Sequence, residues 1–323
     1  MHTTDAITKA YAVLDGGTLS EALARELIET PREYAMDLYS LANKVRLSVQ
    51  QKFDACTIIN AKSGGCTEDC AFCAQSASHQ ADIDTYPLLS EEKILEKARE
   101  AKASGASAFS IVTSGNGYKT PNREFEKIIS AIRRIRAEVG IAMHVSLGIL
   151  GDETLRMLKD ADVSMIHHNL ETAPSFFPNI CTTHTIGERI ETVRRAKALG
   201  MAVCSGGIIG LGETPAQRVE LAFTLKGLDV DSIPINVLNA IEGTRVTAAP
   251  ISIREIINTV AVFRLVNPRM TIKIAAGRET ALGDWQGLVF NAGANSMLIG
   301  GYLTTCGRSI TADQGLIRSL TGF

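Results

Sequence analysis

The sequence predicts an α/β protein, a (βα)₈ barrel of the TIM type with an N-terminal helical extension, and three observations lead to that prediction. The chain has 323 residues, which suits one such barrel of about 250 residues with additions. Hydrophobic residues make up 45%, enough for a large core. Short β-rich runs alternate with amphipathic segments after residue 50, without a compositional break. A doubly wound open sheet is the alternative for the same pattern.

Two units are expected along the chain. Residues 1–50 should form a helical extension packed on the barrel, with helices at 19–29 and 35–50. Residues 51–323 should form the barrel with a C-terminal cap. The eight expected strands are 55–61, 108–114, 142–148, 164–171, 202–210, 232–238, 271–277 and 296–301.

Helix signals stand between these strands. An apolar stripe at helical spacing is formed by Ile128, Ile132, Ile135 and Val139. Thr185 and Ser252 are each followed three residues later by Glu, which is the capping-box pattern. Thr214 is followed by Pro215, and proline favours the first helical position. These signals predict helices that begin at the three positions.

The bulk charge and hydropathy exclude several classes of protein. A net charge of −2 gives no electrostatic footprint for nucleic acid. No apolar run approaches the roughly 18 residues needed to span a membrane, and the N-terminus lacks a signal-peptide pattern. We therefore expect a cytoplasmic protein, where thiols stay reduced. Its seven cysteines are then more readily explained as metal ligands than as disulfides.

Three cysteines form the most informative motif of the chain. Cys66, Cys70 and Cys73 have the spacing C-x₃-C-x₂-C, with Phe72 before the last. A structural zinc site or a fully ligated cubane needs four protein ligands, whereas this loop offers three. Three thiolates suit three corners of a [4Fe–4S] cluster and leave the fourth iron open. The alternatives are a zinc loop that borrows His79, or three buried structural cysteines.

This loop resembles the signature of the radical S-adenosylmethionine (SAM) superfamily at each defining position. The resemblance implies that the open iron chelates the amino and carboxylate groups of SAM. An electron from the cluster then cleaves SAM to methionine and a 5′-deoxyadenosyl radical. The loop directly follows the first expected strand, at the end of the barrel where such folds carry their chemistry.

Other residues at strand ends could handle SAM. The segment 203–213, which includes Gly206, is rich in glycine and would let a ligand approach the backbone. Asn169 and Glu171 follow the fourth strand and could bond to ribose hydroxyls. Arg189, in the first turns of the helix after Thr185, could pair with a carboxylate. An ordinary helix-surface arginine is the alternative for Arg189.

Over nearly its whole length the chain resembles the biotin synthase family. Besides the cysteine loop, the segments that carry this resemblance are 168–172, 179–183, 203–213, 234–236, 276–279, 292–296 and 303–305. The resemblance implies conversion of dethiobiotin to biotin, with sulfur from an auxiliary iron–sulfur cluster held deeper in the barrel. It implies SAM contacts from Phe72, Asn169, Glu171, Arg189 and Ile208. It implies dethiobiotin contacts from Asn169, Asn236, Thr304 and Thr305.

The chain departs from the family pattern at two contacts. Glu171 stands where the family usually has Asp, a change of one methylene that should still reach a ribose. His167 stands where an Asn helps to hold the ureido ring, which puts that contact in doubt.

The larger departure concerns the auxiliary cluster, which the family usually binds through cysteines of strands 2, 3 and 5 and an arginine of strand 7. Cys204 and Arg278 fit this pattern, but Ser110 and His144 replace the other two cysteines. We therefore expect a relocated cluster of the four-iron type that carries an extra sulfide. Its expected ligands are Cys56 and Cys204 with Cys306 or Cys181, and Arg278 should face it. Each of these cysteines could instead be a small buried hydrophobe.

The resemblance also implies partners, and two other classes of protein stay open. Expected partners are a flavodoxin or ferredoxin as electron donor, iron–sulfur assembly proteins, and a second copy in a homodimer. One alternative is another radical SAM enzyme, similar to hydrogenase maturases or methylornithine synthase, which would not need Asn236 or Arg278. The other is a non-enzymatic iron–sulfur scaffold or sulfur carrier, which leaves the SAM-handling residues unexplained.

Overall fold

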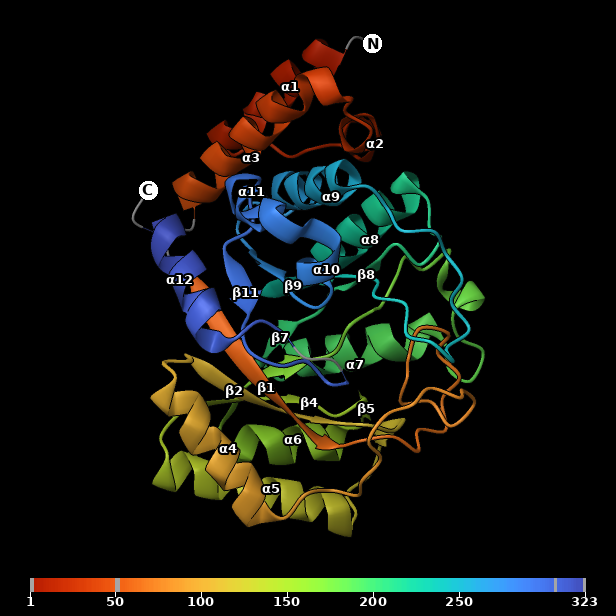
Figure 1. The fold of residues 1–323 in the computed structure, drawn as a ribbon, viewed down its shortest axis with the longest axis vertical. Coiled ribbons are helices and arrows are strands. Elements are labelled where there is room, and N and C mark those ends of the chain that lie inside the picture. Colours follow the sequence, from red (N-terminus) through yellow and green to blue (C-terminus); the bar gives the residue numbers. More distant parts are fainter. Residues whose placement is uncertain (1–2, 50–52, 305–306, 322–323) are drawn as a thin grey trace.

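The computed structural model describes residues 3–49, 53–304 and 307–321, and its centre is a closed parallel barrel (Figure 1). The strand order is β10-β11-β1-β2-β4-β6-β7-β9, and pairing of β9 with β10 closes the ring. The short β8 continues the position of β7 and pairs with β9. The strands are β1 (Asp54–Lys62), β2 (Ala108–Thr113), β4 (Ala142–Ser146), β6 (Val163–His167), β7 (Ala202–Cys204), β8 (Gly207–Ile209), β9 (Ser232–Val237), β10 (Thr271–Ile274) and β11 (Ser296–Leu298).

All eight expected strand positions are thus confirmed, and the closed ring excludes the open doubly wound sheet. In a parallel barrel each strand is covered on both faces, by the barrel interior and by the outer helices. Accordingly every residue of β2 is buried. A small second sheet of β3 (Gly117–Tyr118) and β5 (Ile149–Leu150) was not expected from the sequence.

Helices surround the barrel and start at the expected signals. Thr185 and Ser252 form capping boxes, and Thr214 caps a helix that has proline in its first turn. The isoleucines of the apolar stripe are buried on one face of α5. The outer helices are α4 (Glu91–Ala103), α5 (Arg123–Glu138), α6 (Asp152–Asp160), α7 (Ile186–Ala198), α8 (Pro215–Gly227), α9 (Ile253–Val266), α10 (Arg278–Leu282), α11 (Gln286–Asn291) and α12 (Ile310–Thr321), with the 3₁₀ turns η3 (Phe177–Asn179) and η4 (Gly283–Trp285).

The N-terminal helices gather at one end of the molecule, against α8 and α9 (Figure 1). They are α1 (Thr3–Ala10), η1 (Tyr11–Asp15), α2 (Glu21–Ile28), η2 (Arg32–Tyr34) and α3 (Ala35–Val49). Tyr39 of α3 donates a hydrogen bond to the side-chain oxygen of Asn258 at 2.9 Å. The amide nitrogen of Asn258 in turn donates to the carbonyls of Ile28 and Thr30. This buried polar contact fixes the N-terminal helices to α9. The boundary that we placed at residue 50 lies outside the described residues and stays a prediction.

Within the described ranges, no helix is both long and apolar enough to cross a membrane.

Candidate active site

The three-cysteine loop lies at the carboxyl end of β1 and opens onto the barrel cavity. The backbone of Cys66 exchanges hydrogen bonds with Gln75 and Ala77, at 3.0 and 2.8 Å. The N–H of Cys73 donates to the carbonyl of Cys70 at 2.9 Å, which turns the chain back on itself. As a result all three cysteines line one cavity of about 290 Å³. We refer to this group as the rim site.

The spacing of the rim sulfurs fits a cluster better than a single ion. Two thiolates on one tetrahedral zinc ion are about 3.8 Å apart, given Zn–S bonds of about 2.3 Å. Among the described residues, the one group of three ligand atoms that all lie within 4.8 Å of one another is Cys70, Cys181 and His184. The sulfurs of Cys66, Cys70 and Cys73 are therefore not packed as three ligands of one ion.

His79 does not complete a zinc site with the loop. Within the part of the chain that the structure describes, no group of three ligand atoms within 4.8 Å of one another includes His79. Its Nδ1 lies 2.8 Å from the carbonyl oxygen of Cys73. Burial raises the pKa of Cys73 to about 11 and also raises the pKa of Cys70. Both groups are therefore thiols unless a metal ion displaces their protons. The rim site thus fits a metal cluster bound by three cysteines.

Asp69 clamps the loop to the segment that follows η3. Its carboxylate accepts hydrogen bonds from the backbone and hydroxyl of Thr182, at 2.9 and 2.6 Å, and from the backbone of Thr183 at 3.3 Å. Burial acts to raise the pKa of Asp69, but these hydrogen bonds outweigh it and hold the pKa well below its usual range. Next to it, the Nδ1 of His184 forms a hydrogen bond of 2.5 Å with a carboxylate oxygen of Glu68.

The structure brings the expected SAM residues together beside this loop. Arg189 donates from Nε to His184 at 3.0 Å and from Nη1 to the carbonyl of Asn169 at 2.8 Å. Its guanidinium is 3.6 Å from Glu171. Burial raises the pKa of Glu171, and the positive charge of Arg189 opposes that shift. Arg189 is therefore a part of the cavity wall and not an ordinary surface residue, since it lines the rim cavity.

Glu171 is held in an unusual backbone conformation. Its φ is +70°, in the left-handed region that a residue with a side chain adopts only when its surroundings require it. The carbonyl of Glu171 accepts a hydrogen bond from Ile208 at 2.7 Å, and the residue forms a bridge with Gly207. These contacts turn its carboxylate toward the cavity.

A second cavity of about 280 Å³ adjoins the first and shares several of its residues. Phe72, Asn169, Glu171 and Asn236 line both cavities, and Ile208 and Thr304 line the second. The side chain of Asn236 donates to the carbonyl of Gly207 and accepts from the backbone of Ala276, both at 3.1 Å. Thr305 lies outside the described residues.

Gly206 has a packing role that was not expected. It lines neither cavity. A Cβ at this position would lie 2.0 Å from the carbonyl oxygen of Pro234. The glycine is thus required for packing of the connection between β7 and β8 against β9, and its contact with SAM stays a prediction.

The bottom of the rim cavity carries a second group of candidate ligands, which we call the deep site. It consists of Cys56 on β1, Cys204 on β7 and Lys273 on β10. Lys273 Nζ lies 3.0 Å from Cys56 Sγ, and all three residues are buried. Burial acts to lower the pKa of Lys273, but the two cysteines outweigh it and raise that pKa. The deep site therefore provides a buried cation beside two thiols.

Two histidines stand next to the deep site. The Nε2 of His167 lies 3.1 Å from the Nδ1 of His144. Burial and then the charge of Lys273 lower the pKa of His144 to about 4 and place that of His167 well below its usual value. Both are neutral at pH 7. Ser110 pairs in register with His144, and its buried hydroxyl has no partner among the described residues.

Arg278 does not reach the deep site, which corrects our expectation. Its guanidinium donates to both carboxylate oxygens of Asp313 at 2.8 Å and also to Gln286, and it lies 3.1 Å from Glu279. Arg278 is fully buried but lines neither cavity. The reason is that β10 ends at Ile274, so Arg278 already belongs to α10.

Sequence reasoning missed Lys273, although a signal for it was present. Residues of one strand alternate between the two faces, so Lys273 and Ala275 share a face. Both line the cavity. The expectation for Arg278 came from the family resemblance, which places an arginine on strand 7.

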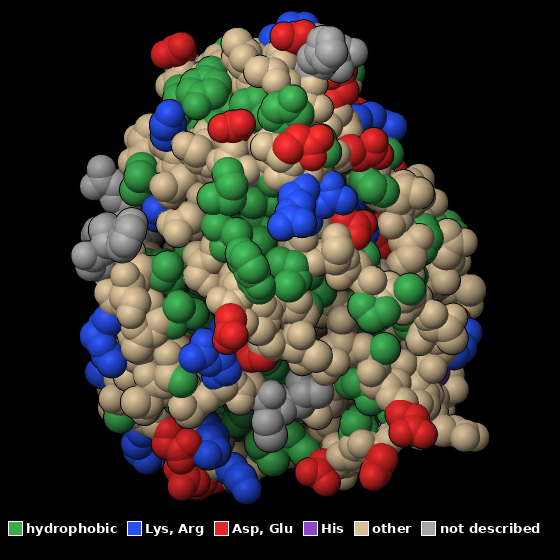
Figure 2. All heavy atoms as spheres, turned by 45° about the horizontal axis from the view of Figure 1, so that its top comes forward, with side chains coloured by type: hydrophobic (Ala, Val, Ile, Leu, Met, Phe, Trp, Pro, Cys, Tyr) green, Lys and Arg blue, Asp and Glu red, His purple; other side chains and the backbone are tan. Residues whose placement is uncertain are grey.

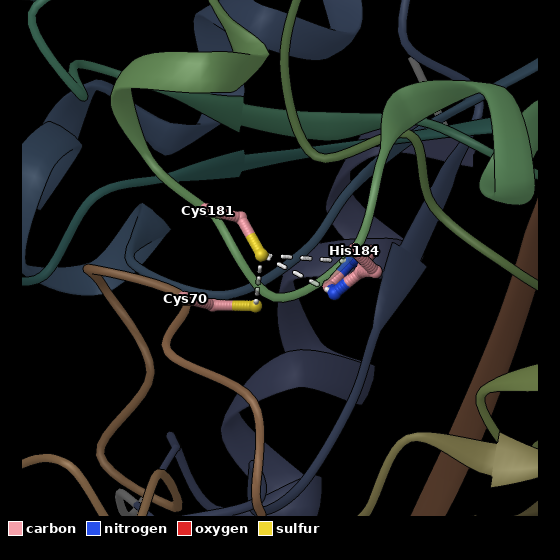
Figure 3. A group of neighbouring side chains, drawn as sticks. All are labelled: Cys70, Cys181 and His184. Carbon is pink, nitrogen blue, oxygen red and sulfur yellow. Dashed lines mark hydrogen bonds between the residues drawn. The ribbon is translucent and has the colours of Figure 1, made fainter.

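Cys181 is also placed differently from our expectation. Its Sγ is 3.8 Å from Cys70 Sγ, at the rim (Figure 3). It does not line the cavity that contains Cys56 and Cys204. Cys181 is therefore no ligand of a deep cluster. Cys306, the other candidate, lies outside the described residues.

Comparisons with known proteins agree with this geometry. Residues 61–225 match the model of the radical SAM superfamily, and residues 234–321 match the Biotin and Thiamin Synthesis associated domain. The chain is 49% identical over 313 residues to the biotin synthase of Citrifermentans bemidjiense, covering 96% of this chain and 95% of that protein. It is 48% identical over 310 residues to the biotin synthase of Carboxydothermus hydrogenoformans, covering 95% of each.

Solved structures show the same fold at low identity. Methylornithine synthase superimposes with a TM-score of 0.82 at 22% identity, over 96% of this chain and 94% of that one. The FeFe-hydrogenase maturase of Carboxydothermus hydrogenoformans superimposes with a TM-score of 0.79 at 17% identity, over 100% of this chain and 84% of that one. These two therefore support the barrel, whereas the higher identities to biotin synthases distinguish the family. The chain belongs to the radical SAM superfamily and, within it, to the biotin synthase family.

Proposed function

We propose that this protein is a radical SAM sulfurtransferase that converts dethiobiotin to biotin. The observation that carries the proposal is one continuous cavity with the rim cysteines at its mouth and Cys56, Cys204 and Lys273 at its bottom. Asn169 and Asn236 line this cavity and the adjoining one. Such an arrangement lets a substrate lie between a source of radicals and a source of sulfur.

At the rim, Cys66, Cys70 and Cys73 would hold a [4Fe–4S] cluster. When bound there, this cluster supplies the electron that cleaves SAM into methionine and the 5′-deoxyadenosyl radical. Arg189 offers a fixed guanidinium for the carboxylate of SAM, and Glu171 offers acceptors for ribose hydroxyls. Phe72 and Ile208 add apolar surface at the same place.

Between the two sites, polar side chains would orient dethiobiotin. Asn169 and Asn236 each present an amide that fits the ureido ring, which has both donors and acceptors. Each amide is fixed by the backbone: Asn169 accepts from Gly206 at 3.3 Å, and Asn236 bonds to Gly207 and Ala276. Thr304 and Thr305 would bind the valeryl carboxylate.

At the deep site, Cys56 and Cys204 would hold an auxiliary iron–sulfur cluster that is consumed as the sulfur donor. We propose a four-iron cluster with an extra sulfide, with Cys306 as the remaining thiolate. Lys273 replaces Arg278 as the cation beside this cluster. A buried ammonium stabilises thiolate and sulfide charges that would otherwise be costly in the barrel interior. Ser110 and His144 are harder ligands, and thiolates dominate cluster ligation.

The reaction requires partners and a compartment that keeps thiols reduced. We propose a flavodoxin or ferredoxin as electron donor, iron–sulfur assembly proteins for both clusters, and a location in the cytoplasm. We also propose a homodimer. Hydrophobic side chains gather among charged ones at the end with the N-terminal helices (Figure 2). The large exposed ones on these helices are Tyr11, Tyr34, Met36, Leu47 and Val49.

The test is product formation by the anaerobically reconstituted, reduced protein with SAM and dethiobiotin. We expect both 5′-deoxyadenosine and biotin, measured by liquid chromatography and mass spectrometry. Deoxyadenosine with no biotin would refute the substrate and favour another radical SAM reaction. If protein with its full iron content forms neither product, the proposal that it is an enzyme is refuted.

A further inference from the structure

The thiol of Cys181 lies against the rim ligand Cys70, and the proposed function leaves it without a role (Figure 3). Cys181 is buried, at 4% exposure. It belongs to the segment after η3, which is tied to the cysteine loop by the Asp69 clamp and by a hydrogen bond of 2.7 Å from Ala71 to the carbonyl of Ile180. The two sulfurs are therefore held at a fixed separation by the backbone.

The distance of 3.8 Å between the sulfurs of Cys181 and Cys70 excludes two roles for Cys181. A disulfide would need about 2.05 Å between the sulfurs. Sulfurs that share one tetrahedral ion are already about 3.8 Å apart, so sulfurs on two different irons of a cluster are farther apart. Cys181 thus cannot be the fourth corner ligand of a cluster held by Cys70. The distance equals that of two sulfurs on one ion, and His184 completes such a group. With Cys70 bound to the rim cluster, however, the contact that remains is a hydrogen bond between the two sulfurs.

The direction of that hydrogen bond follows from the neighbouring histidine. Arg189 is donor-only and points its Nε at the Nε2 of His184, so Nε2 accepts and the ring proton is on Nδ1. Nδ1–H donates to Glu68 at 2.5 Å and also lies 3.2 Å from the sulfur of Cys181 (Figure 3). Neither ring nitrogen is therefore free to accept the proton of Cys181.

Three acceptors remain for the thiol of Cys181, and the hydroxyl of Thr183, 3.5 Å from its sulfur, is the first. The other two are a carboxylate and a second sulfur. One is the carboxylate of Asp69, which already accepts hydrogen bonds from Thr182 and Thr183. The other is the sulfur of Cys70, which becomes a thiolate and hence an acceptor once it binds iron. In the structure, Cys70 donates to Cys181. Iron binding removes the proton of Cys70, so in the metal-bound state the direction reverses and Cys181 is the donor of the pair.

We propose that Cys181 is a positioning residue for the rim cluster, donating an S–H hydrogen bond to the Cys70 ligand and so raising the reduction potential of the cluster. The inference rests on the proposed role of Cys70. Reduction adds negative charge that spreads onto the ligand sulfurs, and a donor at such a sulfur stabilises the reduced form. The cluster would then accept its electron from a weaker donor than it otherwise could.

The test is the reduction potential of the rim cluster in Cys181→Ala, Cys181→Ser and wild-type protein. The signal that changes on addition of SAM identifies the rim cluster. We expect Cys181→Ala to lower the equilibrium constant for reduction about threefold, which is about 30 mV for one electron. Electron–nuclear double resonance in H₂O and D₂O should show one exchangeable proton fewer near the rim cluster in Cys181→Ala than in wild-type protein. Cys181→Ser keeps an O–H donor and should stay close to wild type.

Ile180→Val is the matched control, because Ile180 belongs to the same apolar group as Cys70 and Cys181. It removes one methylene and leaves the thiol. An unchanged potential and proton signal in Cys181→Ala would overturn the inference, as would equal shifts in Cys181→Ala and Ile180→Val. Wild-type protein with no SAM-sensitive cluster would overturn the rim site itself. A wild type that makes biotin while Cys181→Ala keeps its potential would overturn the Cys181 inference alone.

Discussion

The rim site and the deep site share one cavity but are built in opposite ways. The rim cysteines come from one loop, from Cys66 to Cys73. The deep residues come from three strands, with Cys56 on β1, Cys204 on β7 and Lys273 on β10. A site on one loop is defined by its spacing, whereas a site on three strands is defined by the register of the barrel. The comparison explains why one spacing motif predicts all three rim ligands, whereas a single sequence predicts only part of the deep group.

Charge also separates the two sites. At the rim, burial raises the pKa values of Cys70 and Cys73, so their thiolates depend on the metal. At the deep site, Lys273 stands 3.0 Å from Cys56 and has a raised pKa. A cation is therefore in place there before any metal binds. Burial also raises the pKa of Cys204, but Lys273 opposes that shift. The deep site thus has a cation of its own beside its sulfurs.

The largest expected effect separates the chemistry of the two sites. Cys70→Ala should lower 5′-deoxyadenosine formation by more than about 100-fold, because it removes a ligand and not just an outer partner. Cys204→Ala should abolish biotin formation and leave the deoxyadenosine produced with SAM and reductant. Both products are measured in one assay. Loss of deoxyadenosine in Cys204→Ala as well would mean that the two sites are not independent.

The next expected effect tests which basic residue serves the deep site. Lys273→Met removes the buried cation and should lower auxiliary iron retention and biotin yield about 10- to 100-fold, as loss of an outer partner of a metal site does. Iron is counted in a background that lacks the rim cysteines. Arg278→Met is the matched variant and should keep its auxiliary iron in the folded fraction. Loss of auxiliary iron in Arg278→Met but not in Lys273→Met would instead support the expectation that Arg278 faces the auxiliary cluster.

Arg278 should instead matter for folding. Its pair with Asp313 is buried, and breaking a buried pair by removing one partner costs about 3–5 kcal/mol. We expect this loss in the free energy of unfolding of Arg278→Met, measured by denaturant titration. Lys273→Met should lose less stability, because the recorded partner of Lys273 is a cysteine sulfur and not a carboxylate. A stable Arg278→Met variant would show that α12 is not fixed to the barrel by this pair.

The smallest expected effect concerns pH at the rim. The pKa of Asp69 is depressed in the folded protein, so its carboxylate stabilises the fold above its unfolded pKa of about 3.9 and loses that contribution as pH falls further. Asp69→Asn should cost about 1–3 kcal/mol at pH 7, since it removes a charged acceptor. The difference from wild type should shrink below about pH 4. A difference that stays constant down to pH 3 would contradict the assigned clamp.

The comparison also shows how far sequence reasoning reaches. The eight strands, the helix starts and the rim cysteines follow from local patterns, and the structure has them where they were expected. The break after Cys204 was not expected, because it depends on how close Pro234 of a neighbouring strand lies to Gly206. The placement of Cys181 beside Cys70 depends on the Asp69 clamp, which joins segments more than a hundred residues apart.

Arg278 and Lys273 show the same limit within one segment. Both residues are basic, and they lie five positions apart. The segments that carry the family resemblance include Arg278 but not Lys273. Strand alternation would have selected Lys273, provided that the end of β10 had been known to be Ile274. Strand ends depend on tertiary pairing, here with β9 and β11, and this is the information that a single sequence does not contain.

The most direct test of two separate cluster sites is the iron content and Mössbauer spectrum of a variant in which Cys66, Cys70 and Cys73 are all replaced by alanine. Only the deep site then remains. We expect about four irons per chain with a cubane-like spectrum, and loss of that iron on adding Lys273→Met. A stable two-iron signal would contradict the four-iron proposal, and an iron-free chain would contradict a deep site that forms independently of the rim.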